Sequence, residues 1–328
     1  MQPTVEDVAR AAGVSRQTVS NVLNAPERVR PETRERVEAA IAQLGYRPNR
    51  VAQSLRASSS RMIGYRIEPV HPFAVGSIHD RLLHALADAG RAEDHHLLLY
   101  TADDLDGEIA GALALHRAGA VDGFVLYGLH AGDPRPPALL HHGIPFAAFG
   151  RTGHDEGHPW VDVDNAAGTA AATRHLVEVG HRRIAFAGYP RGGDVGERRA
   201  EGWRATLEAC GLPPGPDLRG EDSLATGARL AAELLDDPEP PTAVVAATDT
   251  LAAGLLRGAR DRGARLAVVG FDDTPTAAAL DLSSVRQPIE AVGHAMVRAL
   301  LNPAPPDGPP AASLLPPELI VRGSSCPP

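Results

Sequence analysis

The chain has 328 residues, of which 43% are hydrophobic and 22% are charged, with a formal net charge of −9 at pH 7. This composition is typical of a folded protein and excludes disorder throughout the chain. At about 150 residues per domain, the length predicts two structural units, or three if one is small. No stretch approaches the roughly 20 apolar residues that span a bilayer. Because residues 1–10 are also polar and acidic, we expect a cytoplasmic protein without membrane contact.

Potential metal ligands and nucleophiles are present, but their spacing excludes several kinds of site. Cys210 and Cys326 lack the paired spacing of a metal or redox site. His154 and His158 fall in a Gly-rich run that cannot place them on one helix face, which favours a solvated loop over a metal site. The Gly192-Gly193 pair lacks the rest of a phosphate-binding loop, and the chain contains no Lys. Since no Gly-x-Ser-x-Gly nucleophile occurs either, we expect no catalytic residues, no metal and no cofactor.

Basic charge is concentrated at the N-terminal end of the chain. Residues 1–61 contain ten Arg and six acidic residues, a net charge of +4, which leaves −13 for the remainder. A basic segment attached to an acidic body can bind phosphates while the body is repelled by them. The negative total therefore does not exclude a nucleic-acid-binding protein.

The first 45 residues predict three short helices. Residues 4–13 begin with a capping-box pattern and carry one apolar stripe. Residues 15–24 predict a second helix that Ser15 can cap, and residues 31–45 a third, preceded by Arg30 instead of the more usual Ser or Thr. Two helices joined by a short turn, with a third behind them, form a helix-turn-helix.

The second of these helices has an outer face suited to reading DNA bases. Its apolar residues turn inward, which leaves polar side chains on the outer N-terminal face. These polar side chains are Arg16, Gln17, Ser20 and Asn21. Arg pairs with guanine, and Gln or Asn with adenine, in the major groove, which recognition helices read with their N-terminal residues. The alternative is the solvated face of a small helical bundle, and composition does not decide between the two.

Beyond a linker-like run at residues 57–60, strand-length apolar runs alternate with amphipathic helical stretches. The predicted strands are Met62 to Ile67, His96 to Tyr100, Gly123 to Leu126, Pro145 to Phe149, Arg183 to Gly188, Thr242 to Ala247 and Leu266 to Phe271. The predicted helices include Ile78 to Ala89, Asn165 to Val179, Arg198 to Ala209 and Asp249 to Arg262. This alternation predicts an α/β fold with parallel sheets covered on both faces. A break near residues 151–159 divides it into two similar sets, which predicts two lobes with a cleft between them.

Motifs along nearly the whole chain resemble those of the lac and galactose repressor family. In the head they are Thr4-Val5-Glu6-Asp7-Val8-Ala9, Ala12-Gly13-Val14-Ser15, Gln17-Thr18-Val19-Ser20, Thr33-Arg34-Glu35-Arg36-Val37 and Leu44-Gly45-Tyr46-Arg47-Pro48-Asn49. In the body they are Trp160 to Asn165, Gly180-His181-Arg182-Arg183-Ile184, Arg199-Ala200-Glu201-Gly202-Trp203, Thr248-Asp249, Val269-Gly270-Phe271-Asp272-Asp273 and Leu319-Ile320-Val321-Arg322-Gly323-Ser324. The head motif is highly specific, and the body landmarks agree with it in order and spacing.

The resemblance implies three parts. These are a helix-turn-helix DNA-binding domain at residues 1–46, a hinge helix and linker at 47–61, and an effector-binding and dimerisation domain at 62–328. The last part is expected to have a periplasmic-binding-protein-like body with two parallel, doubly wound sheets. Its N-lobe is placed at about 62–159 plus 289–313, and its C-lobe at about 160–286 plus 316–328.

The resemblance also implies a homodimer on a pseudopalindromic operator. Residues 49–55 are expected to fold on DNA, pair with their symmetry mate and insert Leu55 at the central base step, where unstacking costs about a few kcal/mol. The alternative for Leu55 is a linker residue packed on the head. Arg50 and Arg56 are expected to contact phosphates. The full set of predicted DNA-contacting residues is Thr4, Ser15, Arg16, Gln17, Thr18, Ser20, Asn21, Asn24, Tyr46, Asn49, Arg50, Ala52, Leu55 and Arg56.

Family members bind a small molecule between the lobes, and we expect a sugar. The matching residues are Arg199, Thr248, Asp249 and Asp272, with Phe73, Arg151 and Gln287 as further wall candidates. Independently, Asp249 and Asp272 follow the carboxyl ends of predicted strands, where open parallel sheets bind ligands. Carboxylates facing such a cleft can form charge-assisted hydrogen bonds with hydroxyls. The alternatives are a helix N-cap for Asp249 and an ordinary surface ion pair for Asp272 and Arg199.

Two features differ from particular family members. Where sugar-binding members commonly carry an aromatic that stacks on the ring, this chain has Asp222, so stacking must come from Phe73, Tyr127 or Trp160. Residues 302–317 are Pro-rich and no leucine heptads follow them, so we expect a dimer and not a coiled-coil tetramer.

Together these patterns predict a ligand-controlled transcriptional repressor. A periplasmic-type sugar-binding protein shares the two-lobed body, but it requires a signal peptide and has no basic head. An enzyme on the same α/β body requires a nucleophile or cofactor motif, which the sequence lacks. Salt-dependent binding to a specific duplex, without turnover of candidate ligands, separates the three classes.

Overall fold

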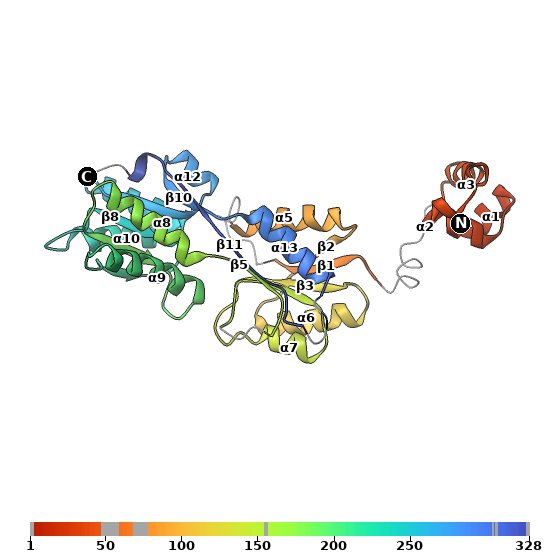
Figure 1. Cartoon of the computed structure of the whole chain (residues 1–328), viewed down its shortest axis with the longest axis horizontal. Coiled ribbons are helices and arrows are strands. Elements are labelled where there is room, and N and C mark those ends of the chain that lie inside the picture. The colour runs from red at the N-terminus through yellow and green to blue at the C-terminus, as the bar shows by residue number, and fades with distance from the viewer. Residues whose placement is uncertain are drawn as a thin grey trace. The chain divides into compact units, whose positions relative to one another are not determined.

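The computed structural model describes residues 3–46, 59–67, 78–153, 157–303, 305 and 308–325 (Figure 1). The chain divides into two compact units, Met1–Ser60 and Arg61–Pro328. We call the first unit the head and the second unit the body, and each is described by itself.

The head is a bundle of short helices around a small apolar core. Its elements are α1 (Val5–Ala12), α2 (Arg16–Asn24), the 3-10 turn η1 (Pro26–Arg28) and α3 (Pro31–Leu44). The capping box of Thr4 is formed in both directions, and the Ser15 hydroxyl caps α2, which confirms both predicted caps. Val8, Val19 and Val37 are fully buried at the centre. The apolar stripes of all three helices therefore face one another, as the sequence periodicity predicts.

The first lobe of the body contains a parallel sheet covered on both faces. Its strands are β1 (Met62–Arg66), β2 (His96–Tyr100), β3 (Gly123–Leu126), β4 (Phe146–Phe149), β5 (Trp160–Val163) and β11 (Ala312–Leu315). They pair in the order β11-β5-β4-β3-β1-β2. Helices α5 (Ile78–Ala92) and α13 (Ile289–Leu301) cover one face, and α6 (Leu105–Arg117) and α7 (Arg135–His141) cover the other (Figure 1).

The second lobe repeats this architecture with different strands. Its strands are β6 (Ile184–Gly188), β7 (Asp217–Arg219), β8 (Ala243–Ala246), β9 (Ala267–Asp272), β10 (Ser283–Arg286) and β12 (Glu318–Ile320). They pair in the order β12-β10-β9-β8-β6-β7, and β12 is antiparallel to β10. Its helical elements are α8 (Asn165–Glu178), α9 (Asp194–Ala209), α10 (Leu224–Leu235), α11 (Asp249–Asp261), α12 (Pro275–Ala279) and the 3-10 turn η2 (Gly323–Ser325). Every residue of β6 and β8 is buried, because helices cover both faces of the sheet.

The boundary between the lobes differs from the predicted one. We placed the start of the C-lobe at about residue 160, but β5 lies in the first sheet, where Ala148 of β4 and Ala312 of β11 both pair with Trp160. The first crossing between the lobes therefore follows Val163, and the second follows β10. The prediction was wrong here because Trp160 to Asn165 has no long apolar run to identify it as a strand.

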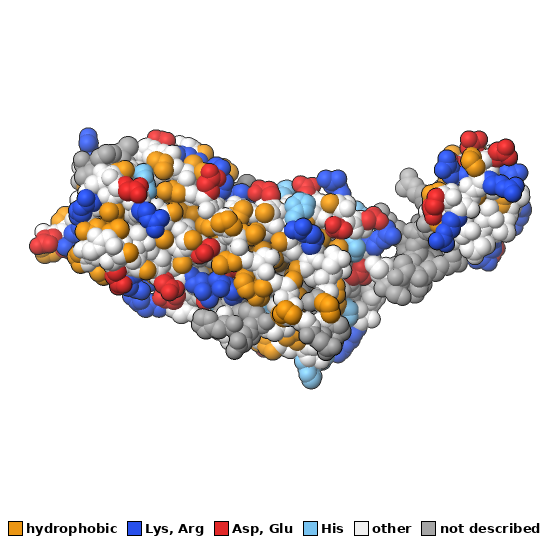
Figure 2. Space-filling view, viewed as in Figure 1, with side chains coloured by type: hydrophobic (Ala, Val, Ile, Leu, Met, Phe, Trp, Pro, Cys, Tyr) orange, Lys and Arg blue, Asp and Glu red, His pale blue; other side chains and the backbone are white. Residues whose placement is uncertain are grey.

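Charged side chains of both signs are scattered over the face of the body that Figure 2 shows. In Figure 2, blue and red side chains are intermixed on the visible face, with apolar side chains between them. Within the described ranges, no helix combines the length and the apolar character that a membrane crossing requires.

Candidate DNA-binding face and interlobe site

The N-terminal face of α2 presents the polar residues that the sequence predicts. Arg16 and Gln17 are exposed, while Ser20 and Asn21 are half-buried. Arg16 pairs with Glu6 of α1 at 2.8 Å, and both side chains are 58% exposed. Such an exposed pair contributes only about 0–1 kcal/mol, so a DNA base can displace Glu6 at little cost.

Two of the predicted base readers are bonded to each other. The Gln17 side-chain amide donates to the Asn21 side-chain oxygen at 3.0 Å. These residues are four apart on α2, where side chains are neighbours on one face. The bond fixes the direction of the Gln17 amide and leaves the Asn21 amide nitrogen available as a donor on the same exposed side.

The remaining head residues of the predicted set serve other contacts in this structure. The Thr4 and Ser15 hydroxyls cap α1 and α2, and Thr18 is within 2.9 Å of the Ser15 hydroxyl. Tyr46 packs partly against the head core. The side chain of Asn24 and the predicted hinge residues lie outside the described residues, and so does Phe73. These hinge residues are Asn49, Arg50, Ala52, Leu55 and Arg56.

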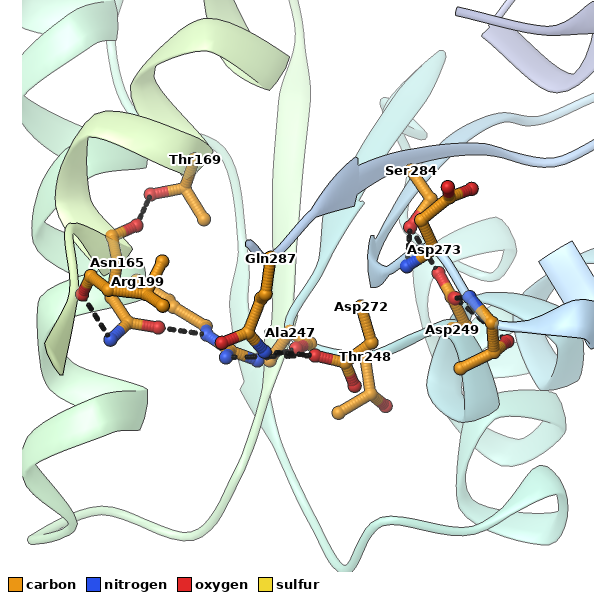
Figure 3. A network of polar contacts seen from close by, with 12 residues as sticks. Asn165, Thr169, Arg199, Ala247, Thr248, Asp249, Asp272, Asp273, Ser284 and Gln287 are labelled. Carbon is orange, nitrogen blue, oxygen red and sulfur yellow. Dashed lines mark hydrogen bonds and ion pairs between the residues drawn. The ribbon is translucent and has the colours of Figure 1, made fainter. Parts of the chain in front are cut away.

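Arg199 is the centre of a buried polar network in the second lobe. Its Nε donates to the Asn165 side-chain oxygen at 2.8 Å, and its Nη1 donates to the backbone oxygen of Ala247. The guanidinium carbon lies 3.6 Å from the centre of the Phe271 ring. Only 4% of the Arg199 side chain is exposed. Arg199 thus ties α8, α9 and the ends of β8 and β9 together (Figure 3).

Asp272 ends β9 beside Arg199 and has an unusual backbone conformation. Its carboxylate accepts from the Gln287 amide at 2.6 Å and lies 3.9 Å from Nη2 of Arg199. Its φ is 107°, and that of Asp273 is 49°. Left-handed conformations cost non-glycine residues about 1–3 kcal/mol each and persist only where the surroundings hold them, often at functional sites.

The burial of Asp272 favours the protonated, neutral form of its carboxyl group. Burial raises the pKa of its carboxyl to about 7, although the Arg199 charge and the Gln287 hydrogen bond both act to lower that pKa. The alternative of an ordinary surface ion pair between Asp272 and Arg199 is wrong, because both side chains are almost fully buried. A partly protonated carboxyl at this position can donate as well as accept a hydrogen bond.

Asp249 lies apart from the Arg199 group. Its carboxylate accepts from the backbone N–H and the hydroxyl of Thr274, at 2.7 and 2.9 Å, and from the Ser284 hydroxyl at 2.5 Å. Figure 3 shows these contacts on the other side of Asp272 from Arg199. Burial raises the pKa of Asp249 to about 6. The alternative that Asp249 is the N-cap of α11 is wrong, because Thr248 is the cap.

Thr248 caps α11 and also forms a hydrogen bond with Asp222. Its oxygen accepts from the Leu251 N–H at 3.0 Å, and its hydroxyl donates to Asp222 Oδ1 at 2.6 Å. Part of Asp222 is exposed to solvent, but the protein around its carboxyl group displaces water and so raises the pKa of that carboxyl, while the charges of Arg199 and His79 lower it. His79 belongs to α5 of the first lobe, so Asp222 stands where the lobes approach each other.

Arg151 extends the polar contacts into the first lobe. Its Nε donates to Asp162 at 2.9 Å, and its guanidinium lies over the Trp160 ring at 5.2 Å. Burial raises the pKa of Asp162. Asp162 in turn is 3.5 Å from the Asn165 amide. A continuous series of polar contacts therefore crosses from one lobe to the other, through Arg151, Asp162, Asn165, Arg199, Asp272 and Gln287.

Sequence reasoning missed several members of this interlobe site. Asp162 lies near the end of β5 and Asn165 begins α8 just after it. This strand was not predicted, although the strand-end argument used for Asp272 also applies to these two residues. Arg81 of α5 contacts the backbone of Asp272, and no motif signals this contact. Tyr127 was considered for ring stacking, and its ring stacks on Tyr65 at 5.1 Å and lies 4.9 Å from the His79 ring.

A helix-turn-helix head together with a two-lobed α/β body is the architecture of a DNA-binding transcription regulator. A model of the bacterial regulatory proteins of the lacI family matches residues 4–49, and a model of the periplasmic binding protein-like domain matches residues 173–325. The chain is 35% identical to the HTH-type transcriptional regulator CelR of Thermobifida fusca, over 92% of each protein. It is 30% identical to the lactose operon repressor of Escherichia coli, over 100% of this chain and 92% of that protein.

Solved structures agree with these sequence relationships. The lac repressor dimer bound to operator and the anti-inducer ONPF has a TM-score of 0.84 and 26% identity, with 99% of this chain and 100% of that chain covered. The transcriptional regulator CelR in its cellobiose complex has a TM-score of 0.72 and 32% identity, with 98% and 99% covered. The chain belongs to the lacI family of bacterial regulatory proteins. It is a DNA-binding transcription regulator and not an enzyme.

Proposed function

We propose that this regulator is a cytoplasmic repressor that binds a pseudopalindromic operator as a homodimer, and whose operator affinity is controlled by a sugar bound between the lobes. The observation that carries the proposal is the face of α2, where Arg16, Gln17 and Asn21 stand on a capped, well-packed helix. The matched lac repressor structure is a dimer on operator DNA, which supports the homodimer and the operator.

On the DNA, Arg16 reads guanine and the Gln17–Asn21 pair reads adenine in each half-site. The side chains of Thr18, Ser20, Asn24 and Tyr46, with the helix ends at Thr4 and Ser15, position the head on phosphates. Between the half-sites, Leu55 enters the central base step, and Arg50 and Arg56 contact phosphates. Asn49 and Ala52 of the same hinge segment complete the DNA-contacting set.

Between the lobes, the sugar contacts Arg199, Asp272 and Gln287, with Thr248, Arg151 and Phe73 at the edges and Asp249 behind Asp272. Asp222 adds an acceptor, because Thr248 occupies only one of its two carboxylate oxygens. Of the three stacking candidates, Tyr127 is buried and stacked on Tyr65, which leaves Phe73 or Trp160 to stack on the sugar ring. The cellobiose in the CelR complex supports a sugar as the class of effector.

The test is selection of duplexes from a random pool with the full chain, followed by affinity measurements at several salt concentrations. We expect one inverted-repeat sequence, a steep salt dependence, and a dimer by light scattering. Equal affinity for selected and random duplexes contradicts the proposal for the head.

A thermal-shift screen of sugars that starts with cellobiose tests the effector, since a ligand at a hundredfold excess over Kd adds about 2.7 kcal/mol to the free energy of unfolding. A response confined to non-sugar metabolites contradicts the proposed sugar alone.

A further inference from the structure

Arg81 of α5 contacts the second lobe at the backbone of Asp272. Its Nη1 donates to the Asp272 carbonyl oxygen at 3.1 Å, and its Nη2 pairs with Glu290 of α13 at 3.3 Å. The Arg81 side chain is 24% exposed, whereas that of Glu290 is 73% exposed. One guanidinium therefore bridges the first lobe and the strand end that carries the Asp272 carboxylate.

The support beneath Arg81 is rigid. Helices α5 and α13 lie side by side on one face of the first sheet (Figure 1). Leu82 and Leu86 of α5 are fully buried in the core shared with α13. A Cβ at Gly293 of α13 would approach the backbone of Ala85 to 2.8 Å, so the two helices touch closely. The packing therefore fixes the backbone that carries Arg81 to the first lobe.

The acceptor of this bond belongs to the left-handed segment. The Asp272–Asp273 peptide lies between two residues with φ of 107° and 49°. Returning either residue to an ordinary conformation turns the carbonyl away from Arg81, because the peptide is planar and rotates as one unit. The Asp272 carboxylate, which Gln287 holds at 2.6 Å, belongs to the same residue and turns with it.

We propose that Arg81 is a positioning residue that couples the arrangement of the lobes to the orientation of Asp272. While Arg81 holds the carbonyl, the segment stays left-handed and the carboxylate faces Gln287 and Arg199. When the lobes separate at α5, the carbonyl loses its donor, and the segment relaxes. This inference goes beyond the proposed function, since it requires neither the effector nor the operator to be known.

The test measures the distance between the lobes in the full-length protein. Cys210 is exposed in the second lobe, and an Ala118→Cys variant adds an exposed label site in the first lobe. With Cys326 replaced by Ser, spin labels on these two sites report one interlobe distance, and an excess of unlabelled protein suppresses distances between protomers. The variants are Arg81→Gln, Arg81→Lys and Glu290→Gln. The matched control is Arg91→Gln, which removes an exposed arginine of the same helix that pairs within α5 with Asp88.

We expect Arg81→Gln to add a second, longer population of distances, Arg81→Lys to restore most of the original one, and Arg91→Gln to match the parent protein. Amide hydrogen exchange supplies the second readout. The Asp273 N–H donates to Ser284 and the Thr274 N–H to Asp249, so both amides should exchange faster in Arg81→Gln, while those of α5 stay protected.

Two results overturn the proposal. One is an unchanged distance distribution together with unchanged exchange at Asp273 and Thr274 in Arg81→Gln. The other is faster exchange along α5 without a change at those two amides, which identifies Arg81 as a support of its own helix. If Arg81→Gln does not fold, the same criteria are applied to Glu290→Gln, because this change neutralises only the carboxylate that pairs with Arg81.

Discussion

At the scale of single residues, Asp272 combines a buried carboxyl with a backbone that few residues adopt. Its pKa of about 7 lies far above the usual 3.8, because burial outweighs the nearby charge of Arg199. The folded state therefore binds this proton more tightly than the unfolded state. The contribution of this carboxyl to the free energy of unfolding is therefore largest below about pH 4, and it is lost as the pH rises toward 7.

We expect the free energy of unfolding of the parent protein to fall between pH 5 and 7, with a slope of up to about 1.4 kcal/mol per pH unit from this group. Asp272→Asn mimics the protonated acid, so its slope should be smaller, although Asp249, with its pKa of about 6, still contributes in the same direction. Urea unfolding across this range measures both slopes. Asp88→Asn, an exposed change on α5, is the control, and equal slopes for parent and Asp272→Asn contradict the raised pKa.

Arg16 is the residue on which base reading depends most. Replacement by Ala should cost about 1–3 kcal/mol on the selected operator and relax the preference at one base pair per half-site. Glu6→Gln removes the competing partner of Arg16 and should tighten operator binding by up to about 1 kcal/mol. Fluorescence anisotropy on operator and single-mismatch duplexes measures both effects. Arg10→Ala is the control, and a loss in Arg16→Ala that is the same on operator and random DNA rules out base reading.

At the scale of elements, the packing of α9 against α8 places Arg199. Gly202, one turn after Arg199, has no room for a side chain, because a Cβ there would lie 2.0 Å from the backbone oxygen of Ala166. The two helices can therefore approach closely enough for Arg199 to reach Asn165 at the start of α8. The motif around Arg199 thus includes a packing requirement as well as a charged side chain.

Gly202→Ala should destabilise the body by about 1–3 kcal/mol, because the added methyl group forces α9 away from α8. Gly111→Ala on α6 is the matched control, since its Cβ would meet only the Tyr100 ring at 3.6 Å. That change should be neutral, or stabilising by about 0.5–1 kcal/mol through helix propensity. Thermal unfolding of both variants measures the two effects. Similar melting temperatures would show that α8 and α9 can accommodate the added methyl group.

At the scale of the whole molecule, the structure separates residues that hold the body from residues available to a ligand. Arg199 contacts Asn165, Phe271 and the Ala247 backbone, so its removal leaves buried polar groups without partners. Asp222 is exposed and contributes one hydrogen bond to Thr248. The two residues therefore need different experiments.

We expect Arg199→Ala to lose both stability and effector response, whereas Asp222→Asn keeps its melting temperature and its effector-free operator affinity. The Asp222→Asn variant should bind the effector about tenfold or more weakly, since a hydrogen bond to a charged group contributes about 1.5–3 kcal/mol. Calorimetry with the sugar identified in the thermal-shift screen gives the affinity. Glu221→Gln, a neighbouring exposed change, is the control, and unchanged affinity in Asp222→Asn removes this residue from the proposed site.

Local patterns in the sequence predicted the head and most of the body. The caps at Thr4 and Ser15 depend on residues three positions apart, and the central strands β6, β8 and β9 of the second sheet are largely apolar runs, so both are visible in a short window. The same patterns missed β5, β7, β10, β11 and β12, which are short or only partly buried. Their pairing partners lie far away in the sequence, and no local signal records them.

The sequence by itself determined the helix-turn-helix, the alternation of strands and helices, and the residue types at the strand ends. Only the tertiary structure decided which of these residues meet. It placed Asp249 behind Asp272, made Thr248 the cap of α11, and brought Arg81 of the first lobe onto the backbone of Asp272. Arg81 and Asp272 are 191 positions apart, and they meet because the chain crosses between two separate sheets whose lobes pack against each other. Local propensity acts over a few residues, whereas such a contact depends on how the faces of whole elements pack.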